Sequence, residues 1–301
     1  MICPKCRYQR QLTDAAPQWQ CPACGVAYAK VNSSASVPLA TTENTGIENQ
    51  YGKRTTRENV FTLFVLLSLL LLVASWYGKD KLPARSKMLS EMFNEPIQTA
   101  RRDYPFDFSY RGETYQVTPV ADYEIWGLVV THNDIGGITD ITHNENSVDI
   151  KDLCVIWGAN LENEDYRDVS YSSGDFTCYW SYSRPMNFRF NKIANNHLLS
   201  DDAAVRERIG QTVIGDQVHI KGMLVNYSPV SNPNWIRKTS TTREDTGNHA
   251  CEVVFVQQFD ILHSANAFDN TLFTISKWLV LVALLIKIGS IVGMPLLAAK
   301  S

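Results

Sequence analysis

Hydrophobic and polar residues follow different periods along this chain, and the changes of period divide it into segments. Residues 60–77, VFTLFVLLSLLLLVASWY, carry no charge over eighteen positions. An α-helix rises 1.5 Å per residue, so this run comes close to the roughly 20 residues that cross a bilayer core. Residues 278–297 form a second apolar run, in which Lys287 is the one charge. We predict membrane-spanning helices over residues 58–78 and 276–298.

Between the two apolar runs the pattern changes to short stretches, several of which alternate with period two. Gly, Asn, Asp and Pro separate these stretches, which predict β-strands at residues 113–117, 123–131, 153–157, 176–182, 218–227 and 252–262. One helix is expected at residues 202–209, where Ser200 or Asp201 can cap the start and Gly210 follows the end. Residues 99–268 are therefore predicted to form a mainly β domain with one or two helices.

Two connecting segments flank the first apolar run. Residues 79–98 carry apolar side chains at helical spacing, which predicts an amphipathic helix that acts as a spacer. These side chains are Met88, Leu89, Met92 and Phe93. Residues 32–57 are rich in Ser, Thr, Ala and Asn and have few large apolar side chains, so they predict a disordered linker.

The chain begins with two CxxC pairs, which are separated by 14 residues. Their members are Cys3, Cys6, Cys21 and Cys24. Two such turns can bring four thiolates into a tetrahedron around zinc. Gly25 follows the second pair, where a positive φ lets backbone amides turn towards the sulfurs. Arg7 occupies the equivalent place in the first pair and departs from this pattern. Residues 1–31 are predicted to form a Zn²⁺-binding module with these four cysteines as ligands.

This cysteine pattern resembles a zinc ribbon, and the resemblance covers about residues 1–30. It implies a small fold whose folding free energy comes from the metal, because a core of this size cannot stabilise itself by apolar burial. Zinc ribbons often recognise proteins or nucleic acids. The basic surplus here is small, so we expect a protein-docking or folding role and no binding to nucleic acid. Two disulfides or a redox pair are the alternative interpretation of the cysteines.

Charge is distributed unevenly along the chain. Residues 1–57 hold 7 Lys and Arg against 3 acids, whereas residues 98–275 hold 14 against 24. Basic flanks favour the cytoplasmic side of a membrane, and zinc thiolates favour a reducing compartment. We therefore expect a bacterial inner-membrane protein with both termini in the cytoplasm and residues 99–268 in the periplasm. An acidic domain of this kind also argues against nucleic-acid binding.

The second apolar run has two features that favour helix contacts. Gly289 and Gly293 form a GxxxG pair, and small residues at this spacing let helices approach closely. Lys287 can either snorkel towards the membrane boundary or meet a buried partner on another subunit. From these features we expect a protein partner or a homo-oligomer formed through this helix.

Residues 214–225, IGDQVHIKGMLV, resemble the "GD.V.V.G.L" strand of small OB-like β-barrels. In that pattern a glycine permits a bend at a barrel corner. The wider segment 123–262 looks like uncharacterised bacterial membrane proteins, a resemblance that implies no activity. It does imply an OB-like β-barrel for the middle domain.

Three further cysteines lie in the middle domain, namely Cys154, Cys178 and Cys251. In an oxidising compartment two of them can pair. We prefer the pair Cys154 and Cys178, because both residues lie on predicted neighbouring strands. Three buried thiols are the alternative.

A nucleophilic site needs a thiol or hydroxyl, a base within hydrogen-bond reach, and a group that orients the base. The candidates, in that order, are Cys251 or Ser240, His249 or His197, and Asp201 or Asp245. The sequence has no nucleophile elbow, HExxH helix, P-loop or dinucleotide fingerprint. We therefore expect no catalytic residues and a non-enzymatic sensor, scaffold or assembly component. An envelope hydrolase or transpeptidase-like enzyme is the alternative.

Two other stretches have competing interpretations. Residues 240–247, STTREDTG, predict a polar hairpin loop held by Asp245 and Arg243. The aromatic run either stacks on a sugar ring or belongs to the core or surface of the β domain, and the second interpretation is preferred. This run consists of Phe176, Tyr179, Trp180 and Tyr182.

Overall fold

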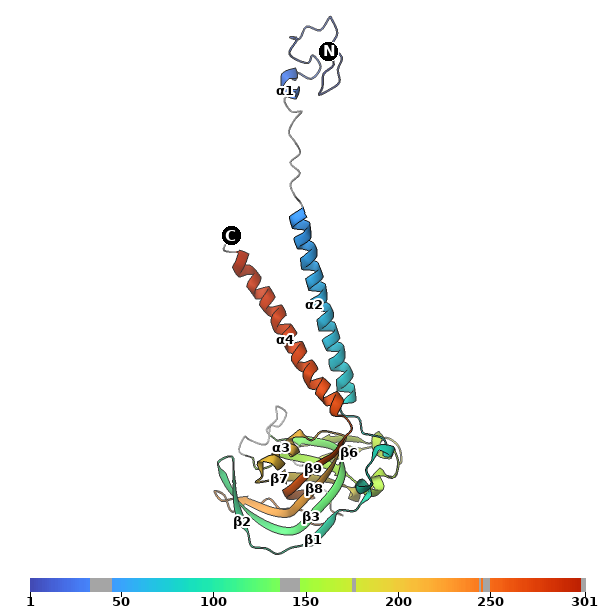
Figure 1. Cartoon of the computed structure of the whole chain (residues 1–301), viewed down its shortest axis with the longest axis vertical. Coiled ribbons are helices and arrows are strands. Elements are labelled where there is room, and N and C mark those ends of the chain that lie inside the picture. Colours follow the sequence, from blue (N-terminus) through green and yellow to red (C-terminus); the bar gives the residue numbers. More distant parts are fainter. Residues whose placement is uncertain (33–44, 136–146, 175–176, 244, 246–249, 299–301) are drawn as a thin grey trace. The chain divides into compact units, whose positions relative to one another are not determined.

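The computed structural model describes residues 1–32, 45–135, 147–174, 177–243, 245 and 250–298 (Figure 1). The chain divides into two compact units, residues 1–63 and 64–301. Across the described residues the fold is mixed and mostly sheet, with α-helices α1 (Tyr28–Asn32), α2 (Thr45–Gly78), α3 (Ala203–Gln211) and α4 (Ala267–Ala298). The strands are β1 (Ile97–Ala100), β2 (Phe106–Tyr110), β3 (Glu113–Asp134), β4 (Lys151–Ile156), β5 (Ser170–Ser173), β6 (Cys178–Ser181), β7 (Ile193–Leu199), β8 (Asp216–Pro229) and β9 (Glu252–Ser264).

Helix α2 extends well before the first apolar run. The sequence predicts a disordered linker over residues 32–57, but the segment 45–57 is helical, so the prediction is wrong there. Lengthening an existing helix needs no new nucleation, so a polar segment can join an adjoining apolar helix. The stretch 33–44 lies outside the described residues.

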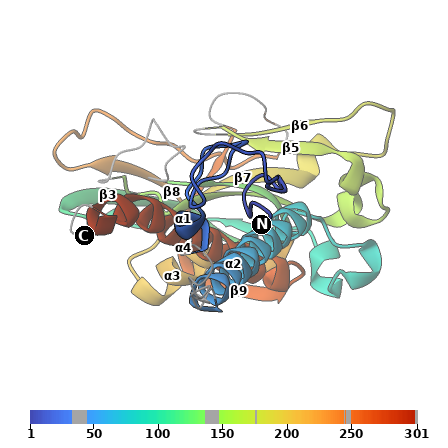
Figure 2. The same cartoon turned by 90° about the horizontal axis from the view of Figure 1, so that it is seen from above.

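Seven strands form one sheet in the second unit. Their order is β1-β3-β4-β7-β9-β8, and β2 also pairs with β3. Strands β7 and β9 run parallel, whereas the other neighbours are antiparallel. A further pairing joins β3 to β8, so β8 is hydrogen-bonded on both sides. Strands β5 and β6 form a separate hairpin beside the sheet (Figure 2).

Strand β3 is longer than the sequence pattern predicts. The two predicted strands 113–117 and 123–131 belong to one strand of 22 residues. Pro119 lies within it, at a register shift against β8 between Pro119 and Ala121. Proline has no N–H to donate and is tolerated at such a bulge, so the strand continues through it.

Strand β4 is buried on both faces. Leu153 and Val155 pack in one core cluster with Tyr123. Cys154 and Ile156 alternate with them and pack in a second cluster on the opposite face. The sheet therefore has a covered outer face as well as an inner core. Side chains on either face of β4 are buried.

Helix α3 closes one side of the inner core. The carboxylate of Asp202 caps it by accepting hydrogen bonds from the backbone N–H groups of Ala204 and Val205, at 2.7 and 3.1 Å. The cap is therefore Asp202, not Ser200 or Asp201. The helix continues through Gly210 to Gln211, two residues beyond the predicted end.

The predicted amphipathic helix over residues 79–98 is wrong. The segment forms two short 3₁₀ turns, Arg85–Lys87 and Ser90–Phe93, and then enters β1. Met92 is fully buried in the outer-face cluster. The side chain of Gln217 accepts from Leu89 N at 2.7 Å and donates to Lys87 O at 2.9 Å. These tertiary hydrogen bonds take backbone groups that a helix would have paired internally.

The end of α2 and the start of α4 are tied to the same part of the β domain. Asn266 donates to the carbonyl oxygens of Lys81 and Ile214 at 2.8 and 2.9 Å. Asn270 donates to the carbonyl oxygen of Lys79 at 3.1 Å. Gly215 has φ +90, and a Cβ there would lie 2.6 Å from the Asn266 amide nitrogen. The two helices therefore leave the β domain from one place.

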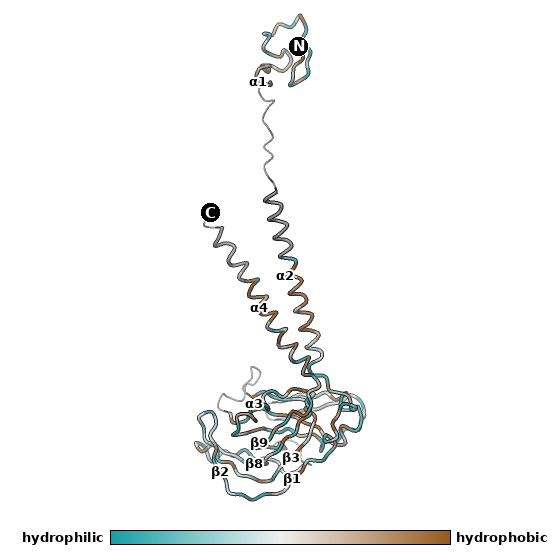
Figure 3. Tube along the Cα trace, in the orientation of Figure 1, coloured by the Kyte–Doolittle hydropathy of each residue, from teal (hydrophilic) through white to brown (hydrophobic). Residues whose placement is uncertain are grey.

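Two segments of these helices are long and apolar enough to cross a membrane. They are Glu58–Gly78 and Ala267–Gly289, with 21 and 23 residues, and Figure 3 colours most of them as hydrophobic. The second begins earlier than the predicted span 276–298. The predicted GxxxG contact involves Gly293, whose surroundings lie outside the described residues.

Candidate metal centre and buried thiol site

Four cysteine sulfurs meet in the first unit, as the sequence predicts. The Sγ atoms of Cys3, Cys6, Cys21 and Cys24 all lie within 4.8 Å of one another. Cys3 and Cys24 are 3.8 Å apart, and Cys6 and Cys21 are 3.6 Å apart. A tetrahedral zinc ion with Zn–S bonds of about 2.3 Å places its sulfurs about 3.8 Å from each other. The cluster therefore fits a metal ion, and four thiolates are a donor set that zinc favours.

The two CxxC turns have the same backbone geometry. Arg7 N donates to the carbonyl of Cys3, and Gly25 N donates to that of Cys21, both at 2.9 Å. Their φ angles are 60 and 68. Arg7 departs from the sequence pattern but adopts the glycine-like conformation, at a steric cost of roughly 1–2 kcal/mol. The first turn is thus completed in spite of its residue type.

Backbone amides stabilise a thiolate in the second turn. Burial raises the pKa of Cys21, but hydrogen bonds from the backbone N–H groups of Cys24 and Ala23 oppose it and lower the pKa to about 6. The thiolate is the form that binds metal. The geometry of this turn therefore prepares a ligand, as the sequence argument for Gly25 expects.

A cluster of polar and charged side chains lies on the outer face of β4 and β7. Asp152 on β4 pairs in register with His197 on β7, and both side chains are buried. Nδ1 of His197 lies 2.7 Å from Oδ1 of Asp152. A guanidinium nitrogen of Arg237, from the segment between β8 and β9, lies 2.6 Å from Nε2 of the same ring.

The protonation of His197 follows from these two contacts. Burial disfavours a charged His197 ring, whereas the carboxylate of Asp152 raises its pKa. A protonated ring, however, would turn an N–H towards Arg237, which is itself only a donor. The 2.6 Å contact is a hydrogen bond only when Nε2 accepts. We therefore assign a neutral ring with its proton on Nδ1, facing Asp152.

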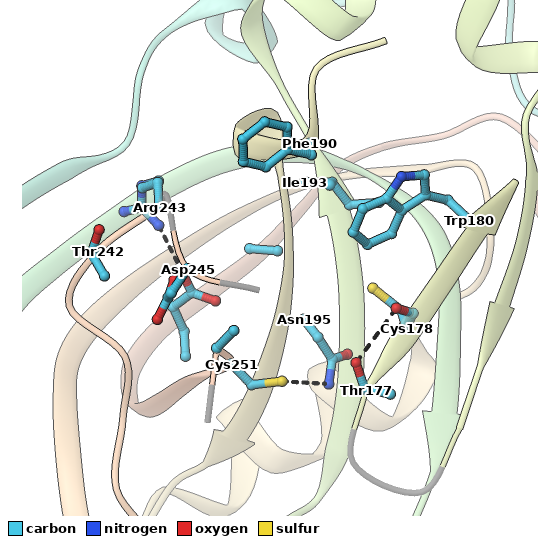
Figure 4. Close-up of a pocket in the computed structure, with 13 residues that line it drawn as sticks. Thr177, Cys178, Trp180, Phe190, Ile193, Asn195, Thr242, Arg243, Asp245 and Cys251 are labelled. Carbon is cyan, nitrogen blue, oxygen red and sulfur yellow. Dashed lines mark hydrogen bonds and ion pairs between the residues drawn. The ribbon is translucent and has the colours of Figure 1, made fainter. Parts of the chain in front are cut away.

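Cys251 lies beside this cluster, immediately before β9. The amide of Asn195 donates to its sulfur at 3.8 Å and also lies 3.4 Å from Nε2 of His197. The thiol is 8% exposed and lines a cavity of about 70 Å³ (Figure 4). The same cavity is lined by Cys178, which forms a disulfide with Cys154, so the preferred pairing of these two cysteines is confirmed.

Glu252 also lines this cavity. Its Oε1 accepts from Arg243 at 2.9 Å, whereas its buried Oε2 makes no hydrogen bond to the described residues. Burial raises the pKa of Glu252 to about 7 against the opposing charge of Arg243. The guanidinium of Arg243 also lies over the rings of Tyr123 and Trp157. This carboxyl therefore changes its charge near neutral pH.

We expect Glu252→Gln to change how stability depends on pH. A pKa raised from 4.5 to about 7 means that the folded state holds the proton more strongly, so the contribution of Glu252 is fully present below about pH 4.5 and is lost as pH rises through 7. Glutamine keeps the neutral form at every pH. The variant should gain up to about 3 kcal/mol relative to wild type between pH 4.5 and 8.

Urea unfolding of both proteins at pH 5 and pH 8 measures this change. All other titrating groups are common to the two proteins and cancel in the difference between them. A stability difference that is the same at both pH values would contradict the raised pKa of Glu252.

Only some of the residues predicted for a nucleophilic site lie close together in the structure. His197 lies near Cys251, but the acid that holds it is Asp152, which the sequence argument did not name. Ser240 donates to Asp245 at 2.6 Å, as expected of the predicted loop. The candidate His249 lies outside the described residues.

Some aromatic side chains of the predicted run pack against the β domain, and others are exposed to solvent. Trp180 and Phe188 have ring centroids 6.4 Å apart and pack against the outer-face cluster. Tyr179 and Tyr182 are exposed. Phe176 lies outside the described residues.

The signal for the Asp152, His197 and Arg237 cluster could not be read from sequence spacing. Asp152 and Arg237 lie 45 and 40 residues from His197. The run IANNHLL itself is polar at its centre and buried throughout, so it has no alternation. Only the pairing of β4 with β7 reveals the cluster.

No family model, curated protein or solved structure matches this chain. Function is therefore inferred from the residues and their geometry.

Proposed function

We propose that this chain is a connector across the bacterial inner membrane, with a zinc ribbon in the cytoplasm and an OB-like β-barrel in the periplasm. It acts as a non-enzymatic sensor, scaffold or assembly component. The observation that carries the proposal is a difference in cysteine chemistry on the two sides of one apolar helix. Four thiols cluster before α2, whereas Cys154 and Cys178 are joined as a disulfide after it.

Cysteine chemistry supports two compartments. Metal-binding thiolates persist under reducing conditions, and disulfides persist under oxidising ones. The segment between the two sets contains Glu58–Gly78, which is long and apolar enough to separate two such compartments. We assign zinc as the metal because four thiolates at this spacing suit its tetrahedral geometry.

The common origin of α2 and α4 supports a hairpin through the membrane. Asn266 and Asn270 bond carbonyl groups just after α2, so both apolar helices start at one place on the β domain. A second span returns the chain to the side of the first unit, and its basic end agrees with a cytoplasmic location. Both termini are then cytoplasmic.

Strand connectivity supports an OB-like barrel. The path β3-β4-β7-β9-β8 is joined back to β3 by the pairing of β3 with β8. Helix α3 lies between β7 and β8 in the chain, and β7 and β9 are parallel. A five-stranded Greek-key barrel of the OB type is the architecture that we assign to this pattern.

The geometry at His197 favours a binding role over catalysis. A general base needs a nitrogen that can accept the proton of the nucleophile. Asp152 faces Nδ1 and Arg237 donates to Nε2, so both ring nitrogens are occupied in the buried cluster. The alternative of an envelope hydrolase or transpeptidase would need Arg237 to move away.

Exposed apolar side chains support a protein partner for the first unit. Leu12 and Trp19 are exposed, as are Met1 and Ile2. A module of about 30 residues that holds its fold through metal can leave such side chains for a partner. Helix α4 binds either a protein partner or a second copy of this chain. Nucleic acid is not among the partners that we propose.

Labelling with a membrane-impermeant maleimide tests the topology. We expect Ser183→Cys, an exposed position in the β domain, to react in spheroplasts. We expect Ser36→Cys and Ser301→Cys to react only after detergent is added. The wild-type chain, which retains all seven native cysteines, is the matched control.

Each outcome has a distinct meaning. Protection of Ser183→Cys in spheroplasts would contradict the periplasmic location of the β domain. Labelling of Ser301→Cys without detergent would show that α4 does not cross, and labelling of Ser36→Cys would place the first unit outside the cytoplasm.

A further inference from the structure

Three side chains form a row across β4, β7 and the start of β9. Cys154 pairs in register with Asn195, and Asn196 pairs with Glu252. The amide of Asn195 donates to the sulfur of Cys251 at 3.8 Å, so the row continues from Asn195 to Cys251. Partners in register project to the same face of a sheet. All three side chains therefore lie on the outer face.

The disulfide and the third thiol border one space. Cys178, on the β5–β6 hairpin, is bonded to Cys154 and lines the 70 Å³ cavity together with Cys251 (Figure 4). Cys154 is completely buried beneath the hairpin, whereas Cys178 and Cys251 retain 6% and 8% exposure. Of the two disulfide partners, Cys178 is therefore the one that lines the cavity together with Cys251.

We propose that Cys251 is an exchange thiol for the Cys154–Cys178 disulfide. Its thiolate attacks Sγ of Cys178, a bond forms between these two sulfurs, and the bond from Cys178 to Cys154 breaks. Sγ of Cys154 leaves with the electron pair and takes up the proton that Cys251 lost. The numbers of disulfides and thiols are unchanged, so the step needs no external oxidant or reductant.

Asn195 is placed to assist both ends of this exchange. Its Nδ2 donates to the sulfur of Cys251, which favours negative charge on the attacking atom. Its Oδ1 is buried and makes no hydrogen bond to the described residues. Because Asn195 is the register partner of Cys154, this oxygen can accept the S–H of the released thiol.

The exchange would change what holds the β5–β6 hairpin. In the structure Cys178 ties the hairpin to β4, and after exchange it ties the hairpin to the start of β9. The hairpin carries the exposed ring of Tyr179. The site is therefore a disulfide-exchange centre that moves a surface element without altering the redox state of the protein.

Disulfide mapping of the full chain in detergent tests the proposal. Thiols are blocked with N-ethylmaleimide at harvest, and unreduced peptides are identified by mass spectrometry. In Cys154→Ser protein we expect most of Cys178 to be linked to Cys251. The matched control is Cys178→Ser, in which Cys154 and Cys251 should both remain reduced. Two strand spacings of about 4.8 Å separate their backbones, which exceeds the usual reach of a disulfide.

A measurement on wild type covers the case in which Cys154→Ser does not fold. Native protein is held at pH 8, where thiolates form, and quenched with acid before digestion. We expect a small fraction of the protein to contain a Cys178–Cys251 disulfide after this incubation, and none to contain it before. Its absence from wild type, or alkylation of both Cys178 and Cys251 in folded Cys154→Ser protein, would overturn the proposal.

This inference rests on the proposed periplasmic location, because the starting disulfide must persist there. The two failures are distinguishable in the same map. Reduced Cys154 and Cys178 in freshly harvested wild type would contradict the location. An intact Cys154–Cys178 disulfide with no exchange product would contradict the exchange alone.

Discussion

Replacement of Cys21 by serine is expected to release the metal and unfold the first unit around it. Cys21 is buried in a cluster whose few apolar neighbours include Tyr8, Val26 and Tyr28. Such a core is too small to fold without help, and structural zinc supplies about 10–16 kcal/mol in comparable modules. Loss of one of four thiolates therefore removes most of the folding free energy. Elemental analysis of the full chain should give one zinc per wild-type chain and little in the variant.

The matched control is Cys251→Ser, the same substitution outside the metal cluster. It should leave the zinc content at the wild-type level. Alkylation provides a structural readout, because Cys3 should become fully reactive in the Cys21→Ser protein. Equal zinc in wild type and Cys21→Ser protein, with Cys3 still protected, would show that the cluster is not a four-thiolate site.

The metal centre could be predicted because its signal is local. Each CxxC pair spans four residues, and the distance between pairs is short, so spacing alone brings the ligands together. The one doubtful position, Arg7, adopts φ 60 as Gly25 adopts φ 68. Closure of the turn around the cysteines outweighs the side-chain preference at this position. Residue type alone therefore underestimated the similarity of the two turns.

The buried site in the β domain could not be predicted in the same way. The cluster around His197 joins residues from β4, β7 and the segment before β9, and no periodic pattern marks β7. Its polar residues contact one another across strands, which is a tertiary property. By contrast, β2 has the alternating sequence FDFSY and follows the expected pattern, although it was not among the predicted strands.

The segment after α2 shows why helical spacing alone is insufficient. Met92 and its apolar neighbours have the spacing of an amphipathic helix, yet they pack onto the outer face of the sheet from 3₁₀ turns. Gln217 replaces the missing helical hydrogen bonds. Intrinsic preference is a weak guide when a distant side chain offers the backbone a better partner.

Substitution of Gly222 by alanine is expected to destabilise the β domain strongly. Gly222 lies on β8, between Tyr123 on β3 and Val256 on β9, and a register shift against β9 falls between Lys221 and Gly222. A Cβ at this position would lie 2.1 Å from the carbonyl oxygen of Phe255. This oxygen belongs to the backbone, so relief requires the two strands to separate. We expect a loss of about 3 kcal/mol or more.

Gly210→Ala is the matched control for Gly222→Ala. Gly210 lies inside α3, and a Cβ there would meet no heavy atom within 4 Å. Alanine is favoured over glycine within a helix, so this variant should gain about 0.5–1 kcal/mol. Thermal unfolding in detergent can be followed by tryptophan fluorescence, to which the fully buried Trp157 contributes. The midpoint of Gly222→Ala should be lower than that of wild type by about 10 °C, and that of Gly210→Ala should be equal or higher. A midpoint for Gly222→Ala within about 1 °C of wild type would mean that β8 and β9 do not approach at this residue. The pairing of β8 with both β3 and β9, on which the OB-like assignment depends, would then be wrong.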